Sequence, residues 1–229
     1  MTMASYWADH SDKLITALTG HLTIVGWALL FSIVLASLVT VVIMPYRRAS
    51  RVSVNLLGAV YSIPSLALFA ILIPVFGIGR GTAIIVLTAY NQYLLVRNFL
   101  AGFDAVDPVL IEAADGMGMA RWQTLLWVKL PIAFPAMMAG IRLAVISTIN
   151  IATIAATINA GGLGTILFDG LRTQNTVKLL WGAVLSAGLV IAANLLLSGI
   201  QKLVERRFLQ PKTKSPGRPA RMDSQISLP

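Results

Sequence analysis

Cysteine is absent from this 229-residue chain, and charged side chains are scarce. The lack of cysteine excludes disulfides, thiol catalysis and thiolate metal sites, and it leaves the redox compartment undefined. Asp, Glu, Lys and Arg together make up only 12% of the chain, whereas soluble domains carry about 25%. This scarcity of charge argues against an ordinary soluble domain.

Residues in the arrangements that enzymes use are also missing. The two histidines, His10 and His21, lie near the amino terminus, and no two acidic residues share an apolar segment. The pattern G-x-x-x-x-G-K-[ST], which binds nucleotide phosphates, does not occur. The sequence therefore predicts no catalytic residue, no metal site and no cofactor.

The chain does contain long hydrophobic segments. Hydrophobic residues make up 57% of it, and its mean hydropathy is +0.79. A membrane-spanning helix needs about 20 apolar residues, so five or six such helices fit with short connections. We predict an all-α integral membrane protein with one domain.

Five apolar segments are long enough to be read as spans. Pro64 and Pro74 should kink or end the second. The third carries Asn91 and Gln92, and the fourth carries Arg142 and Asn150. The predicted spans cover residues 22–44, 54–75, 82–96, 132–158 and 179–200.

Basic residues decide the predicted orientation. With five spans and the amino terminus outside, fourteen of the 18 Lys and Arg residues lie inside and four lie outside. The positive-inside rule favours this arrangement. It gives an outer segment over 1–21 with no removable signal peptide, a transmembrane domain over 22–200, and a basic, partly disordered cytoplasmic tail over 201–229. The net charge of +9 then fits an anionic inner leaflet without any nucleic acid.

The polar interval between the third and fourth spans, residues 102–131, predicts two short helices. Asp107 and Pro108 form a helix start, Gly116 and Gly118 form a break, and a second helix can follow over 120–128. The first helix would gather apolar side chains on one face, from Leu110, Ile111, Ala114 and Met117. This face either packs on the protein's own inner rim or binds a partner.

The interval also resembles the cytoplasmic loop of ABC importer permeases. The matching residues are Glu112, Ala113, Ala114, Gly118, Val128, Leu130 and Pro131. In that family the loop contains a coupling helix that sits in a groove of the ATPase subunit. The resemblance implies a type I ABC importer permease fold, with ATPase-coupling roles for Glu112, Ala113, Ala114, Gly118, Leu130 and Pro131.

Further segments narrow the resemblance to osmoprotectant permeases, for glycine betaine, choline, carnitine and related amines. They are IPSLAL at 63–68, VDPVLIEAADGMGM in the loop, and AGGLG at 160–164 within a longer match. AGGLG discriminates least, because methionine and other amino-acid importers have similar turns, and it also reads simply as a tight turn. The resemblance spans roughly residues 53–208.

Polar residues at membrane depth generally face an interior or a cavity. Five are candidates for a translocation path, although each could equally hydrogen-bond two helices together. They are Asn91, Gln92, Asn150, Thr153 and Thr157.

The resemblance implies alternating-access import in the bacterial inner membrane. The expected partners are ABC ATPase subunits that bind the ATP, an extracytoplasmic solute-binding protein, a second permease subunit and membrane lipid. An aromatic cage for a quaternary amine would lie in the binding protein. The alternatives are a methionine or other amino-acid permease, an ion-coupled secondary transporter, and a membrane scaffold.

Overall fold

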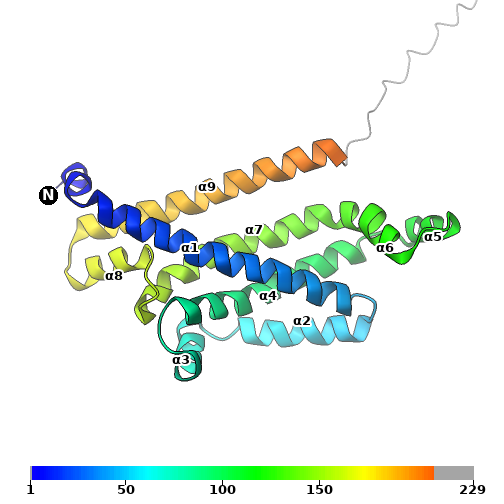
Figure 1. Ribbon diagram of the computed structural model, residues 1–229, viewed down its shortest axis with the longest axis horizontal. Helices are drawn as coiled ribbons and strands as arrows, with labels where there is room; N and C mark the ends of the chain where they lie inside the picture. The colour runs from blue at the N-terminus through cyan, green and yellow to red at the C-terminus, as the bar shows by residue number, and fades with distance from the viewer. Residues whose placement is uncertain (1, 209–229) are drawn as a thin grey trace, which may run out of the picture.

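The computed structural model describes residues 2–208, which form a bundle of helices running between two opposite ends (Figure 1). We call one end the α5 end, because α5 and α6 project from it, and the other the α8 end, where the amino terminus and α8 lie. The elements are α1 (Met3–Ile43), α2 (Arg47–Tyr61), α3 (Ser65–Phe76), α4 (Arg80–Asp104), α5 (Pro108–Gly116), α6 (Arg121–Gln123), the π-helix η1 (Thr124–Lys129), α7 (Leu130–Ile154), the 3-10 helix η2 (Ala155–Ile158), α8 (Gly164–Arg172) and α9 (Thr176–Phe208).

The first helix is longer than the first predicted span. Helix α1 extends back to Met3, with a kink at His10, where the backbone leaves helical geometry (φ −135°, ψ 18°). The segment before the kink packs on α9, where the Trp181 indole donates a hydrogen bond to the carbonyl of Met3 (3.2 Å) and its ring lies tilted against that of Trp7, with 5.1 Å between the ring centroids. The predicted outer segment 1–21 is therefore largely helical and docked on the bundle.

The second predicted span is broken. Helices α2 and α3 meet at an angle of 93°, and Pro64 is the residue at the start of α3. Proline has no backbone N–H and restricts the residue before it, so it ends the first helix as predicted. The carbonyl of Ile63 at the break accepts a hydrogen bond from the Tyr90 hydroxyl of α4.

Helix α4 lies at the centre of the bundle, in contact with α1, α2, α3 and α7. Its pairing with α7 is close because two glycines lie in the contact. A Cβ at Gly102 would come within 2.9 Å of the Ala133 carbonyl, and one at Gly140 within 2.6 Å of the Asn98 Cβ. Small residues of this kind let membrane helices approach closely.

Three of the described helical segments are long and apolar enough to cross a membrane, or four if the bent α2–α3 pair counts as one span. The prediction of five spans is not confirmed by this criterion. Helix α4 has 25 residues, but Asn91, Gln92 and Arg97 reduce its apolar content. Residues 201–208 continue α9, and the remainder of the predicted tail, from 209, lies outside the described residues.

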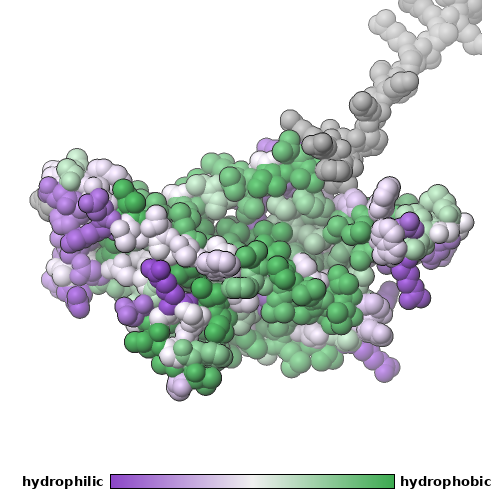
Figure 2. Space-filling model, viewed as in Figure 1, coloured by the Kyte–Doolittle hydropathy of each residue, from purple (hydrophilic) through white to green (hydrophobic). Residues whose placement is uncertain are grey.

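The surface shows the pattern of a membrane protein. On the face seen in Figure 2, hydrophobic side chains cover the middle of the bundle and hydrophilic ones gather at the two ends. In α9, no residue of the apolar window that could cross a membrane is fully buried, so much of the apolar surface of this helix lies on the outside of the bundle.

Candidate functional site

A hairpin made of α5, α6 and η1 projects from the α5 end (Figure 1). The Asp107 carboxylate begins it by accepting a hydrogen bond from the Val109 N–H (2.9 Å), with Pro108 in the first helical position. Helix α5 ends at Gly116, and Gly118 then adopts a left-handed φ of +74°, which suits glycine. The structure therefore contains the predicted helix and glycine break.

The second half of the hairpin differs from prediction. In place of one helix over 120–128, a single turn of α-helix is followed by the six-residue π-helix η1. A π-helix accommodates one extra residue per turn, and such segments are frequent at functional sites. Trp122 and Trp127 remain 60% and 74% exposed along this stretch.

The predicted coupling residues fall into two groups. Glu112 and Ala113 are exposed on α5, and a Cβ at Gly118 would meet nothing within 4 Å. Ala114, by contrast, is buried, while Leu130 and Pro131 are half-buried at the start of α7. The hairpin thus presents Glu112 and Ala113 outward and uses Ala114 for its own packing.

The apolar face expected on α5 is only partly present. Leu110 and Met117 are exposed, Ile111 is half-buried and Ala114 is covered. Other exposed apolar side chains, which the prediction omitted, extend this surface along α5, α6 and η1. They are Val109, Trp122, Leu126 and Trp127.

Asn91 and Gln92 lie in a buried polar layer that joins three helices. The Asn91 amide donates to Ser32 Oγ of α1 (3.1 Å) and to Thr148 Oγ1 of α7 (2.8 Å). The Gln92 amide donates to the carbonyls of Ser32 (3.3 Å) and Thr88 (3.1 Å). These contacts correspond to the helix-joining alternative, and sequence reasoning missed Ser32 and Thr148 because no pattern marks the partners of a buried amide.

The other three candidates for a translocation path lie apart from this layer. Asn150 and Thr157 are exposed, and Thr153 is half-buried with its hydroxyl donating to the Ile149 carbonyl of its own helix (3.1 Å). The five candidates therefore do not form one cluster within the described chain. Asn150 is the one that leaves an exposed amide near the carboxyl-terminal end of α7.

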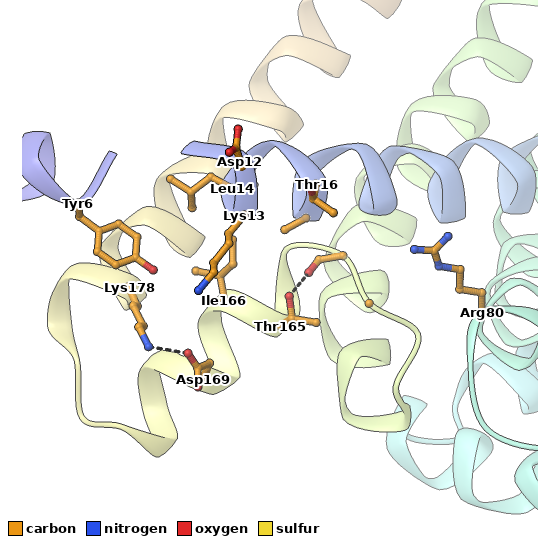
Figure 3. A pocket seen from close by; sticks show the side chains of 13 residues that line it. Tyr6, Asp12, Lys13, Leu14, Thr16, Arg80, Thr165, Ile166, Asp169 and Lys178 are labelled. Atoms are coloured by element: carbon orange, nitrogen blue, oxygen red, sulfur yellow. Dashed lines mark hydrogen bonds and ion pairs between the residues drawn. The ribbon is translucent and has the colours of Figure 1, made fainter. Parts of the chain in front are cut away.

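A cleft of about 530 Å³ opens at the α8 end, between the start of α1, the turn at 161–162 and α8 (Figure 3). It carries both charge signs: Lys178 donates a hydrogen bond to Asp169 (2.6 Å), and Asp12, Lys13 and Arg80 also line it. The hydrogen bond from Lys178 holds the pKa of the Asp169 carboxyl below its ordinary value.

The AGGLG segment forms one wall of this cleft. Gly161 and Gly162 both have positive φ, and the Arg80 guanidinium donates to the Ala160 carbonyl (3.3 Å). His21, fully buried in α1, accepts a weak hydrogen bond from the Leu163 N–H at 3.4 Å. The segment is thus a tight turn, as one reading predicted, and it is also fixed to α1 and α4.

The chain matches the family described as "Binding-protein-dependent transport system inner membrane component" over residues 28–210. It is 34% identical over 206 residues to the osmoprotectant import permease protein OsmW of Salmonella typhimurium (strain LT2), covering 88% of this chain and 96% of that protein. It is 31% identical over 208 residues to the glycine betaine/carnitine/choline transport system permease protein OpuCB of Bacillus subtilis (strain 168), covering 91% and 96%.

Solved structures share the fold. An inward-facing crystal form of the MetNI methionine ABC transporter gives a TM-score of 0.77 at 23% identity, covering 83% of this chain and 95% of that chain. An amino acid ABC transporter gives 0.69 at 18% identity, covering 90% and 99%. These likenesses confirm the predicted permease fold.

Proposed function

Since the chain belongs to the family of binding-protein-dependent transport system inner membrane components, we propose that it is the permease subunit of an ABC importer for osmoprotectants such as glycine betaine, choline or carnitine. The solute class is inferred from the similarity of this chain to permeases named for these solutes, which extends over about nine-tenths of the chain. Family membership makes the chain a translocation component and not an enzyme.

Energy comes from a separate ATPase subunit, because the sequence has no phosphate-binding loop. The α5–η1 hairpin is the contact for this subunit. Its exposed apolar side chains, Leu110, Met117 and Trp127 among them, leave a surface that a partner would bury. Glu112 lies exposed within it and supplies a polar contact, while Gly118 permits the turn.

The α5 end faces the cytoplasm in this proposal. Arg47, Arg48 and Arg51 lie at the start of α2, and Arg97, Arg121 and Lys129 lie in the last turns of α4 and in the hairpin. The α8 end carries fewer basic residues: Lys13, Arg80, Arg172 and Lys178. This asymmetry supports an outer amino terminus. The cleft at the α8 end then opens toward the side from which a solute-binding protein delivers its ligand.

A second permease subunit completes the path. Asn150 is exposed four residues before the end of α7, within the apolar segment that could span a membrane, and a polar group inside a span favours an interior or cavity over lipid. A partner subunit packed on this face would enclose Asn150, Thr153 and Thr157 between the two chains. Asn91 and Gln92 hold the helices that carry this face.

Uptake measurements test the solute. Cells lacking this gene, and the same cells with it restored, are given labelled glycine betaine or labelled methionine at high osmolarity. Restored betaine uptake is expected. Restored methionine uptake alone would move the chain to the amino-acid importers, the alternative to which the solved structures belong.

A further inference from the structure

A second cleft, of about 470 Å³, lies at the α5 end, between the first turns of α2 and the last turns of α4. It has no part in the proposed coupling contact or translocation path. The end of α1, α2 and α4 each supply part of its lining. The lining residues are Met44 after α1, Arg47, Ser50, Arg51, Val54 and Asn55 on α2, and Arg97, Leu100, Ala101 and Asp104 on α4.

The charge of this lining is unbalanced. Three arginines, Arg47, Arg51 and Arg97, face one acidic residue, Asp104. Among the side chains of residues 2–205, the ion pairs involve only Asp169, so none of these arginines has a carboxylate partner there. Arg97 instead donates to the Tyr93 hydroxyl (2.8 Å) and lies over the Tyr93 ring, 5.7 Å from its centroid.

Two features make this arrangement costly without an anion. Arg47 and Arg51 are four residues apart on α2, and like charges at that spacing repel each other. Both also lie near the amino-terminal end of α2, which has no acidic residue in its first turn and where the helix dipole disfavours cations. A bound anion would relieve both repulsions, and guanidinium groups match the geometry of phosphate.

The rest of the lining identifies the kind of anion. Met44, Val54 and Leu100 place apolar side chains beside the arginines, and Val52 and Leu56 leave further exposed apolar surface on α2. A free phosphate gains nothing from contact with an apolar wall, whereas the acyl chains of a phospholipid can pack against it. Basic clefts between helices at a membrane surface are known to take anionic headgroups.

We propose that the cleft between α2 and α4 binds the phosphate of an anionic phospholipid, with Arg47, Arg51 and Arg97 as its ligands. The lipid's acyl chains lie along the apolar wall of the cleft and the outer surface of α2. The proposal rests on the membrane location of the family and not on the solute, so a failed uptake assay leaves it standing.

Binding is tested on the full-length chain purified in detergent, by native mass spectrometry with phosphatidylglycerol, phosphatidylcholine or inorganic phosphate. Phosphatidylglycerol should remain bound where phosphatidylcholine does not. The double variant Arg47→Gln/Arg51→Gln should weaken phosphatidylglycerol binding roughly tenfold or more, since each basic residue at a membrane surface contributes about a factor of five. Asp104→Asn should strengthen it.

Arg48→Gln is the matched control, because Arg48 is exposed on the same turn of α2 but does not line the cleft. An equal loss of phosphatidylglycerol binding with Arg48→Gln would show that only the general surface charge matters, and it would overturn the proposed site. If inorganic phosphate displaced the lipid at comparable concentrations, the ligand of the cleft would be a free anion and not a phospholipid.

A photoactivatable phosphatidylglycerol tests the unmodified protein and so does not depend on the folding of any variant. Labelling should concentrate on Met44, Val54 and Leu100. Labelling spread evenly over the exposed surface of α9 would overturn the proposal. So would a loss of labelling when ATPase subunits are added, because that would make the cleft part of the ATPase contact.

Discussion

The two connections that flank α7 are both rich in glycine, but they differ in what surrounds the glycines. In the hairpin before α7, a Cβ at Gly116 or Gly118 would meet nothing within 4 Å. In the segment after α7, a Cβ at Gly164 would lie 1.9 Å from the Thr153 carbonyl oxygen, and one at Gly162 would lie 2.9 Å from the His21 ring. The first connection needs glycine for its turn, while the second also needs it for space. The open one remains free to bind a partner, and the filled one fixes α8 to the bundle.

Alanine at one glycine of each connection should give the largest difference. Gly164→Ala forces the backbone of α7 or α8 to move, and overpacking of this kind costs about 1–3 kcal/mol or more. Gly116→Ala places a methyl group in open space within a helix, so stability should be unchanged or slightly higher. Thermal unfolding of both variants in detergent measures this. Equal midpoints would show that the second connection is not filled.

Charge reversal in the open connection should act on coupling and not on folding. Glu112→Arg should leave insertion and expression unchanged but remove most of the solute uptake, because it replaces the proposed polar contact with the ATPase subunit. ATP hydrolysis then proceeds without transport. Asp115→Arg is the matched control, since Asp115 is also exposed on α5. Normal uptake by Glu112→Arg at normal expression would contradict the coupling role.

The same contrast between filled and open surroundings separates two asparagines. Asn91→Leu removes the hydrogen bonds to Ser32 and Thr148 and should cost about 1 kcal/mol, the usual scale of hydrogen bonds between membrane helices. Asn194→Leu on α9, where the side chain is only half-buried, should change stability little. Unfolding in a graded series of denaturing detergent compares them, and a larger loss for Asn194→Leu would reverse the expected order.

Lys178→Ala should have the smallest effect, and one that depends on pH. Lys178 lowers the pKa of Asp169, so their interaction stabilises the folded state at neutral pH and is lost as the pH falls below the ordinary carboxyl value of 3.8. The Asp169 side chain is 40% exposed, so solvent weakens the pair. The unfolding temperature should drop slightly at pH 7, and this difference should shrink as the pH falls through the lowered pKa of Asp169. A difference that grows in acid would contradict the assignment.

The comparison of α4 with α9 shows what could be predicted from the sequence. Helix α9 contains a long apolar window with no buried residue, so its hydropathy identifies it directly. Helix α4 packs on four neighbours, and it can carry Asn91 and Gln92 because α1 and α7 supply their partners. Hydropathy therefore identifies a membrane span less clearly when the helix is enclosed by other helices.

Local signals predicted local features well. Asp107, Pro108 and Gly118 gave the start and break of the hairpin, and Pro64 gave the break between α2 and α3. The π-helix and the docking of the amino-terminal segment on Trp181 depend on tertiary contacts. No local residue pattern specifies such contacts, so the sequence could not predict them.

The bend between α2 and α3 bears on how the protein keeps the membrane sealed. A helix that stops inside the hydrocarbon layer leaves backbone groups that would otherwise draw in water. Here the Ile63 carbonyl is satisfied by the Tyr90 hydroxyl, and the Ser62 N–H bonds back to the Gly58 carbonyl (3.0 Å). These two groups therefore need no water as a partner, so the chain can reverse direction inside the hydrocarbon layer without drawing water to either of them.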